Sequence, residues 1–591
     1  MSVADQIKAA TASAIEDIYK IPAFADDVLV NTTKPEFEGD YTVVLFSFVK
    51  KFKASPEQLG EDIGSYLVKN NGDVFIAFNV IKGFLNLTLS DTCFLRILKP
   101  GISDEHTINQ VSSTRKVMVE YSSPNTNKPL HLGHLRNNFL GWSIAEILKS
   151  LRNDVMKTCI VNDRGVHICK SMIAWELFAN GASPETTSIK GDHFVGDYYV
   201  RFSTEYKNEV NQLMKAGSSK EDAETNAPIM QKTQQMLVDW ENGDPGVMQL
   251  WKKMNTWVYK GFDETYKRIG TDFDKTYYES ETYLLGKKFV DIGLQKGVLY
   301  QKEDGSIWID LTEEGLDEKL LLRKDGTSVY ITQDLGLAHE KYEDFSYDQS
   351  IYVIADEQNY HMKVLKLILQ KLGMPYADGI FHLSYGMVEL PTGRMKSREG
   401  MVVDADDLAN EMVAIAAKHT KESGKVKDFT ESELEELYEM IGLGALKFFL
   451  LRVDPKKKMI FNPEESIDFH GFTGPFIQYT HARIKSILRR EPPNSSDFTF
   501  SNLLKLEKEL LLLLEQYSTV VKQAANEYNP SIIAIYIFNV AKTYNGFYTE
   551  HSVLNADSEE KKQLRLQLCS LTASTIQSAM ALLGIRVPER M

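Results

Sequence analysis

The chain has 591 residues, which corresponds to about three to five domains at the usual length of roughly 100–200 residues each. Hydrophobic residues make up 43%, charged residues 25% and aromatic residues 10%, an ordinary globular composition that excludes a disordered, collagen-like or wholly coiled-coil protein. The net charge of −15 argues against indiscriminate binding to polyanions, so a nucleic-acid partner would have to dock on local basic patches.

Several features predict a cytoplasmic protein. The run Leu510–Leu514 is far shorter than the ~20 apolar residues that a membrane span needs. The first twenty residues have the pattern of an amphipathic helix rather than of a secretory signal. None of the four cysteines has Cys-x-x-Cys spacing, so we expect reduced thiols, no disulfides and no zinc site. These cysteines are Cys93, Cys159, Cys169 and Cys569.

Residues 1–110 are predicted to form an N-terminal α+β domain. Alternating apolar runs at 41–49 and 84–89 predict strands, and the apolar spacing of 56–67 predicts a helix between them. The segment 99–106, which contains Pro100 and Gly101, predicts a linker to the next domain.

Residues 111–455 are predicted to form a Rossmann-like, doubly wound α/β domain with a parallel sheet. A strand, a polar turn and an amphipathic helix open it, and buried strands with a helix between them follow later. The polar, charged stretch 170–265 has a helical pattern and predicts an insertion. The expected strands lie at 116–121, 350–355 and 382–388, and the expected helices at 135–151 and 361–372.

Residues 456–591 are predicted to form an all-α helical bundle, since long helical patterns dominate and strand signals are nearly absent. The expected helices lie at 478–490, 503–522, 531–548 and 559–584.

The strongest local feature is the group His131, Gly133 and His134, at the predicted start of the first helix of the α/β domain. The unpaired N–H groups and partial positive charge of a helix N-terminus suit a nucleoside triphosphate. Gly133 leaves room for a base or ribose, and the imidazoles can donate hydrogen bonds to phosphoryl oxygens. Taken alone, two ordinary histidines would be the more frequent explanation. Zinc is a weaker alternative, because no third ligand is near in sequence.

The context of these residues favours the phosphate site. The run Ser122–Asn137 resembles, over its whole length, the HIGH-motif region of class I aminoacyl-tRNA synthetases, and specifically of arginyl-tRNA synthetases of the bacterial type. Downstream, Arg394–Arg398 resembles the KMSKS loop, whose basic side chains clamp the β- and γ-phosphates as pyrophosphate leaves. Without this context, a solvated, glycine-bounded loop would be as good an explanation. The resemblance spans nearly the whole chain and is least specific at 170–265.

The resemblance implies binding of ATP, with Mg²⁺ carried by ATP and no dedicated protein site for the metal. The second lysine of KMSKS is replaced here by Arg398, and many arginyl enzymes with such a loop carry a lysine just before the HIGH motif, where Lys128 stands. The charge of Lys128 would replace the missing one. The implied catalytic residues are His131, His134, Lys128, Lys396 and Arg398. The implied ATP contacts are His131, Gly133, His134, Met387, Val388 and Lys396.

An arginine substrate presents a planar cation with five donors, so its pocket needs carboxylates and neutral acceptors. Tyr330 and Asp334 would share one face of a helix, and the resemblance assigns them to the guanidinium end. It assigns Asn125 and Gln358 to the α-amino and carboxylate end. Two further pocket carboxylates are implied, Glu120 and Glu279. Each of these residues alone would also fit an ordinary core, capping or solvated position, but they occur together in the right order.

A transfer RNA partner requires local positive charge. The predicted helix 478–490 supplies it, although a solvated helix face would also explain these cations. Near the C-terminus, three residues are implied to lie near the anticodon. The implied tRNA contacts are His481, Arg483, Lys485, Arg489 and Arg490 on the helix, and Tyr544, Tyr548 and Met591 near the end of the chain. Segments 39–41 and 83–86 resemble the family's extra domain, which supports the outer part of tRNA.

The implied function is arginine–tRNA ligase, with tRNA(Arg), L-arginine and ATP as substrates. We expect a monomer that does not associate with a membrane. In the family, arginine activation itself requires bound tRNA. Two alternatives stay open: a nucleotidyl transferase or class I synthetase of another specificity, and a non-catalytic tRNA-binding relative. A small adenylyltransferase would lack the helical C-terminal domain, and a pocket for hydrophobic amino acids would not use Asp334. A non-catalytic relative would be expected to have lost His131, Gly133 or His134, all of which are present.

Overall fold

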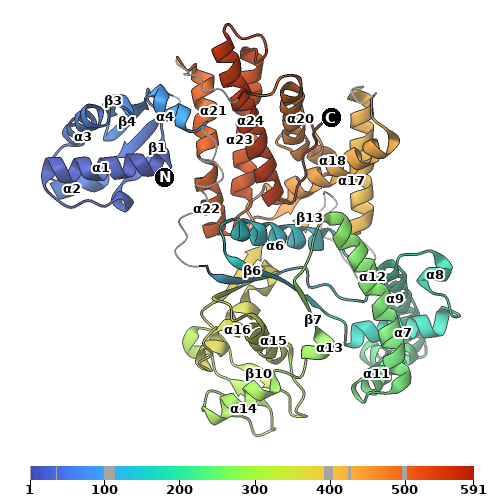
Figure 1. Cartoon of the computed structure of the whole chain (residues 1–591). Coiled ribbons are helices and arrows are strands. Elements are labelled where there is room, and N and C mark those ends of the chain that lie inside the picture. Colours follow the sequence, from blue (N-terminus) through green and yellow to red (C-terminus); the bar gives the residue numbers. More distant parts are fainter. Residues whose placement is uncertain are drawn as a thin grey trace.

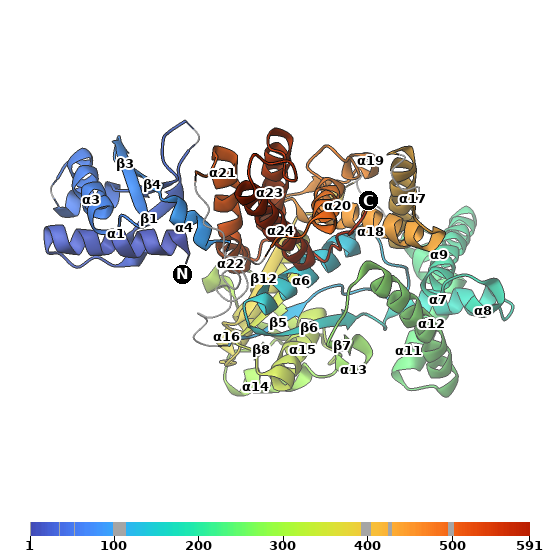
Figure 2. The same cartoon turned by 45° about the horizontal axis from the view of Figure 1, so that its top comes forward.

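The computed structural model describes residues 2–34, 36–52, 54–98, 114–389, 391, 403–423, 428–494 and 502–591. An N-terminal unit (blue) lies on one side, a parallel sheet lies in the middle, and a bundle of C-terminal helices (orange to red) covers one face of the sheet (Figure 1). In Figures 1 and 2 the N-terminal unit and the helices around α9 lie at opposite ends of the molecule. None of the described helices is long and apolar enough to cross a membrane.

The N-terminal unit is an antiparallel sheet with helices, in the strand order β1-β2-β4-β3. The strand expected at 41–49 ends at Val44, and Phe46–Phe52 is helical. The reason is a change of period, since Leu45 and Phe48, three residues apart, are both buried whereas Phe46 is half exposed. The strands are β1 (Leu29–Thr32), β2 (Tyr41–Val44), β3 (Phe75–Ile81) and β4 (Phe84–Leu89), and the helices are α1 (Val3–Tyr19), α2 (Phe46–Phe52), α3 (Pro56–Asn70) and α4 (Asp91–Arg96).

The central sheet has five parallel strands in the order β12-β11-β5-β6-β7, which confirms the doubly wound fold. Its first strand, β5, lies in the middle. The strands β6 and β7 are added on one side of β5, and β11 and β12 are added on the other side, so the order of the strands reverses between β5 and β11. Parallel α/β sheets bind ligands at the carboxyl ends of the strands beside such a switch point. The strands are β5 (Lys116–Glu120), β6 (Asp154–Val161), β7 (Lys275–Tyr278), β11 (Gln349–Ala355) and β12 (Ile380–Tyr385).

Both faces of this sheet are buried, as is usual for parallel sheets. Along β5, Val117 and Val119 point into one hydrophobic core and Met118 points into the other. The first core lies under α6 (Leu132–Ser150) and the C-terminal helices, and the second contains residues of α15 (Tyr330–Phe345) and α16 (Asn359–Lys371) (Figure 1).

Two long connections between elements of the central domain contain additional helices and strands. Between β6 and β7 the chain is helical, as the pattern of 170–265 indicates, and it forms α7 (Val166–Phe178), α8 (Pro184–Thr187), α9 (Gly191–Lys215), α10 (Lys220–Asn226), α11 (Pro228–Glu241) and α12 (Pro245–Ile269). Between β7 and α15 lies a small antiparallel sheet that the sequence did not predict. This second group comprises α13 (Glu279–Thr282), α14 (Lys287–Gln295), β8 (Tyr300–Gln301), β9 (Ile307–Ile309) and β10 (Lys319–Leu322).

The C-terminal part is a helical bundle, as expected, with two local differences. The helix expected at 503–522 is divided into α21 and α22 at Gln516, and Val388 belongs to a separate short strand, β13 (Val388–Glu389), which pairs with β14 (Met459–Ile460). The helices of this part are α19 (Pro463–Ser466), α20 (Gly474–Arg490), α21 (Lys505–Glu515), α22 (Tyr517–Glu527), α23 (Ser531–Glu550) and α24 (Glu559–Leu582), and α17 (Ala405–Ser423) and α18 (Glu431–Leu451) precede it. The domain boundaries near 110 and 455 stay predictions.

Candidate active site

The two histidines of the HIGH-like motif form the N-terminal cap of α6. The Nδ1 atom of His131 accepts a hydrogen bond from the backbone N–H of Gly133 at 3.1 Å, and the Nδ1 atom of His134 accepts one from the backbone N–H of His131 at 3.1 Å. A neutral imidazole carries its proton on the nitrogen that does not accept, so both Nε2–H groups remain available as donors. A side chain at Gly133 would contact the ring of His131, so this glycine leaves room for the histidine itself.

Burial keeps these histidines neutral. It lowers the pKa of His131 to about 4 and lowers the pKa of His134 well below its usual range, and the charge of Lys128 acts in the same direction on both. Burial also lowers the pKa of Lys128, which forms no ion pair with any residue in the described part of the chain. The start of α6 therefore combines two neutral donors with the ammonium of Lys128, with which no carboxylate of the described residues pairs.

The segment that follows the KMSKS-like loop lies directly beside this cap. The backbone N–H of Leu132 donates to the carbonyl of Val403 at 3.0 Å, and the N–H of Ala405 donates to the carbonyl of Leu130 at 3.0 Å. The loop residues Lys396 and Arg398 lie outside the described residues. On the other side of the loop, the side chain of Val388 is buried and the carbonyl of Met387 accepts from the N–H of Met459.

A cavity of about 720 Å³ brings together three of the predicted arginine residues, Asn125, Glu279 and Tyr330. They come from the turn after β5 and from the first residues of α13 and α15. Burial raises the pKa of Glu279 to about 7; the positive charge of Arg164 lowers it, and Asp163 and Asp334 raise it. The charge of Asp334 therefore acts on Glu279, although Asp334 does not line the cavity.

Neither Asp334 nor Gln358 lines this cavity. α15 begins at Tyr330, so Tyr330 and Asp334 share one helical face as predicted. The Oδ2 atom of Asp334 lies 2.6 Å from Nε2 of His361, and this hydrogen bond raises the pKa of His361. Gln358 is exposed on the short turn that follows β11, at the carboxyl edge of the sheet.

Glu120 does not line the cavity either, and its predicted role as a pocket carboxylate stays a prediction that this cavity does not support. It is the last residue of β5 and, two residues after Met118, it points to the same face as Met118, toward α15. There it forms a buried ion pair with Lys341 of α15.

The predicted tRNA surface contains two adjoining cavities, of about 420 and 610 Å³, which share Tyr479, Arg483 and Met591. The guanidinium of Arg483 lies over the rings of Tyr479 and Tyr548, at 4.9 and 5.2 Å from their centres. The larger cavity is also lined by Arg489, Arg490 and Tyr548, and the smaller one by Phe469 and Phe476.

Other predicted tRNA residues have internal roles. Tyr544 is 0% exposed, and its hydroxyl lies 3.2 Å from Sγ of Cys569, so Tyr544 is a core residue and not a surface contact. His481 is also buried, with Nδ1 2.9 Å from the carbonyl of Pro588. Lys485 is partly exposed and forms an ion pair with the exposed Glu589 at 3.1 Å, so its predicted tRNA contact stays a prediction. The helical pattern could not distinguish these positions from the exposed ones, because the C-terminal segment covers one face of α20.

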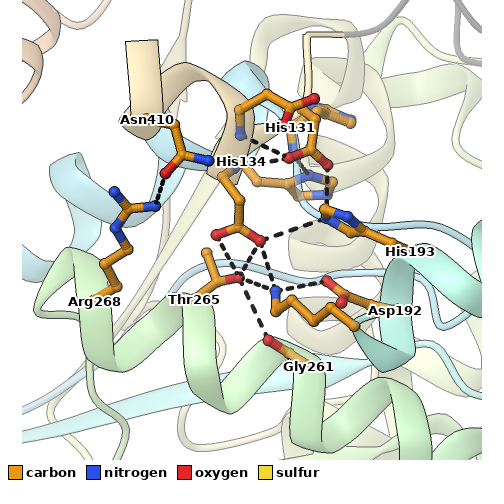
Figure 3. A network of polar contacts seen from close by, with 12 residues as sticks. His131, His134, Asp192, His193, Gly261, Thr265, Arg268 and Asn410 are labelled. Atoms are coloured by element: carbon orange, nitrogen blue, oxygen red, sulfur yellow. Dashed lines mark hydrogen bonds and ion pairs between the residues drawn. The ribbon is translucent and has the colours of Figure 1, made fainter. Parts of the chain in front are cut away.

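The sequence reasoning did not identify a charged cluster beside the histidine cap (Figure 3). It consists of Lys190, Asp192 and His193 at the start of α9, and Asp404 and Asp406 at the start of α17. The density of charge at 190–193 is visible in the sequence, but the carboxylates of α17 that approach it follow more than two hundred residues later, with Lys190 and Asp406 separated by 216 residues.

The comparisons with known proteins cover the whole chain. Three family models match in succession: the arginyl tRNA synthetase N terminal domain at 5–89, the catalytic domain of tRNA synthetases class I (R) at 99–462, and the DALR anticodon binding domain at 477–591. Arginine–tRNA ligases of Parabacteroides distasonis and Bacteroides thetaiotaomicron are each 50% identical to this chain, over 100% of both sequences. The arginyl-tRNA synthetase structure from Thermus thermophilus matches with a TM-score of 0.80 at 24% identity over 100% of both chains. The one from Plasmodium falciparum matches with a TM-score of 0.78 at 19% identity over 100% of this chain and 99% of the other.

Proposed function

The chain belongs to the class I arginyl-tRNA synthetase family, and on this premise we propose that it joins L-arginine to tRNA(Arg) in two steps that consume ATP. In the first step the arginine carboxylate attacks the α-phosphorus of ATP, which forms arginyl-adenylate and releases pyrophosphate. In the second step the terminal ribose hydroxyl of the tRNA attacks the activated carbonyl and releases AMP. Both steps rely on orientation and charge stabilisation, without a covalent enzyme intermediate.

The neutral histidine pair is the observation that carries this proposal. The two Nε2–H groups donate to phosphoryl oxygens whose negative charge grows in the transition state, and they need not lose a proton to do so. The ammonium of Lys128, which no carboxylate neutralises among the described residues, supplies the positive charge. Lys396 and Arg398 are assigned to the leaving pyrophosphate by resemblance alone.

The cavity that contains Glu279 and Tyr330 is the proposed site for arginine. Its volume of about 720 Å³ is in the usual range for small-molecule sites. The guanidinium faces Glu279, Tyr330 and Asp334, and Asn125 and Gln358 hold the α-amino and carboxylate groups. A bound guanidinium would favour ionised Glu279, whose pKa is raised to about 7 in the empty cavity.

Mg²⁺ is proposed to enter with ATP. Within the described ranges, the one group of side chains with metal-ligand spacing is Asp192, His193 and Asp406. The ammonium of Lys190 already contacts both carboxylates of this group, so these residues do not fit a dedicated magnesium site.

The exposed aromatic and basic residues around the two C-terminal cavities are proposed to bind the anticodon. Rings such as Tyr479 and Tyr548 can stack on unpaired bases, and arginines can contact phosphates. The proposed contacts are Arg483, Arg489, Arg490, Tyr548 and Met591. We also propose that the enzyme acts as a monomer in the cytoplasm, where its four buried, unpaired cysteines would stay reduced.

ATP–pyrophosphate exchange, measured with each amino acid and with or without bulk tRNA, tests the proposal. We expect exchange with arginine and only when tRNA is present. Exchange with leucine or cysteine but not with arginine would identify another specificity. Tight tRNA binding without any exchange would identify a non-catalytic relative. Sedimentation velocity decides whether the protein is a monomer.

A further inference from the structure

The side chains of Lys190, Asp192, His193, Asp404 and Asp406 form a charged cluster beside the histidine cap, of which Figure 3 labels Asp192 and His193. The Nζ atom of Lys190 lies 3.1 Å from Oδ2 of Asp192 and 2.7 Å from Oδ2 of Asp406. The hydroxyl of Thr265, on α12, lies 2.5 Å from the same Nζ and 3.1 Å from Oδ1 of Asp406. The Nε2 atom of His193 lies 3.1 Å from Oδ2 of Asp404 and 3.4 Å from Oδ2 of Asp406. One ammonium and one imidazole thus connect α9 with the first residues of α17.

The charges of this cluster nearly balance without a metal ion. Its contacts with the carboxylates of Asp404 and Asp406 raise the pKa of His193 to about 10, so its ring is charged at neutral pH. Burial acts to raise the pKa of Asp406, but the hydrogen bonds from His193 and Lys190 outweigh it and hold that pKa well below its usual range. Two cations therefore face three carboxylates, and the ammonium of Lys190 takes the position between them that a divalent ion would need.

The same carboxylates fix the backbone beside His131. The Oδ1 atom of Asp404 accepts from the N–H of Asp406 at 2.8 Å and from the N–H of Asp407 at 3.1 Å, so it caps α17. The backbone of Asp404 also pairs with that of His131 as an antiparallel bridge. Any movement of Asp404 away from α9 would therefore pull on the chain that positions His131.

The first two turns of α9 also contact the HIGH-like run itself. A Cβ atom at Gly196 would lie 2.8 Å from Cδ of Pro129, so the helix touches the residues just before His131. On its other side α9 crosses α12 closely, because a Cβ atom at Gly261 would lie 2.3 Å from Oδ1 of Asp192. The start of α9 thus lies against α12 and contacts both the HIGH-like run and the first residues of α17.

We propose that Lys190 and His193 are positioning residues for arginine activation: by holding Asp404 and Asp406 against α9, they keep residues 403–405 paired with 130–132 and His131 in its productive place. The proposal rests on the function proposed above, and it gives the helical insertion between β6 and β7 a role in activation. Neither residue lines the cavity proposed for arginine, so their influence should fall on the rate of activation and not on arginine binding.

The test compares Lys190→Met with Lys190→Arg in tRNA-dependent ATP–pyrophosphate exchange on the full-length protein. A misplacement of about 1 Å at a reacting group can lower a rate by roughly 10²-fold, so we expect Lys190→Met to lower kcat by about 10- to 100-fold. The KM for arginine should change little, because Lys190 does not line the cavity proposed for arginine. The Lys190→Arg variant should regain most of the rate, since a guanidinium can also donate to two carboxylates. Lys220→Met, which removes an exposed cation of α10 that pairs with Glu224 at 3.8 Å, is the matched control and should behave as wild type.

A Lys190→Met enzyme with wild-type kcat overturns the proposal. A loss of rate accompanied by an equal rise in the KM for arginine also overturns it, because that pattern indicates general disorder of the catalytic domain. If Lys190→Met does not fold, His193→Gln decides, since this side chain is partly exposed and glutamine keeps one donor but no charge. It should lower kcat severalfold with the KM for arginine unchanged, and wild-type kcat in this variant would equally overturn the proposal.

Discussion

The Nδ1 atom of His134 accepts the backbone N–H of His131 at 3.1 Å, while the Nδ1 atom of His131 accepts the N–H of Gly133 at the same distance. Histidine replaces the serine, threonine, aspartate or asparagine that usually caps a helix. One ring nitrogen of each histidine thus stabilises the start of α6, and the other is free to donate to a ligand. The two tasks use different atoms of His131 and can be separated by substitution.

His131→Asn should keep the cap and lose the donor, because the amide oxygen of asparagine replaces Nδ1 but nothing replaces Nε2–H. We expect arginine activation to fall by roughly 10²–10³-fold, as for loss of one oxyanion donor, with no change in the free energy of unfolding. His131→Gln should show the reverse, because its longer side chain places an amide N–H near the Nε2 position but does not cap the helix. We expect more residual activity than in His131→Asn and a loss of about 1 kcal/mol in the free energy of unfolding. Pyrophosphate exchange and urea unfolding measure the two effects. Wild-type activity in His131→Asn would exclude the Nε2–H group from catalysis.

Lys128→Met tests whether the ammonium of Lys128 beside the cap stabilises the transition state. We expect the activation rate to fall by roughly 10²–10³-fold, with the KM for arginine unchanged, because Lys128 does not line the arginine cavity. Lys128→Arg keeps the charge and serves as the control. An unchanged rate in Lys128→Met would assign the phosphate charge to the segment Arg394–Arg398 alone.

The parts of the fold that could be predicted are those with local signals. The start of α6 could be placed because its cap and its apolar period are contiguous, and β5 because its buried run is bounded by a polar turn. The small sheet β8–β10 was missed because strands of two to four residues have too few positions to show a period. The contacts of Glu120 with Lys341 and of Lys190 with Asp406 could not be predicted, because charge pattern does not specify which distant residue folding brings near.

Stability should depend on pH through His131. Its pKa is about 4 in the folded chain and 6.5 as the ordinary value, so between these pH values the unfolded chain binds a proton that the folded chain does not. The free energy of unfolding should therefore fall as the pH decreases from about 6.5 toward 4, and His134 adds to this fall because its pKa is lowered in the same sense. Urea unfolding of wild type and of His131→Asn from pH 5 to 7.5 isolates the contribution of His131. Parallel pH profiles of stability for the two proteins would show that His131 does not contribute to the pH dependence.

Asp334→Asn should weaken arginine binding and also change His361. Asp334 is 38% exposed and already bonded to His361, so we expect the loss of one hydrogen bond to a charged group and a rise in the KM for arginine of about tenfold to a hundredfold. The pKa of His361 should fall, since the hydrogen bond that its ring donates to the Asp334 carboxylate is the main cause that raises it. NMR titration of the His361 ring measures this second effect independently of arginine. A lowered His361 pKa with a wild-type KM would remove Asp334 from the arginine site and leave it as a partner of His361.

Glu120→Gln should destabilise the protein without altering arginine binding. The side chains of Glu120 and Lys341 are 4% and 0% exposed, so the substitution leaves an unpaired ammonium in the core, at an expected cost of about 3–5 kcal/mol in the free energy of unfolding. Lys341→Met should cost a similar amount, and the double variant Glu120→Gln/Lys341→Met should recover much of the loss, because no charge remains buried. Lys220→Met, which breaks an exposed pair, should change stability by less than about 1 kcal/mol. A Glu120→Gln protein of unchanged stability but raised KM for arginine would return Glu120 to the substrate site and show that Lys341 releases it when arginine binds.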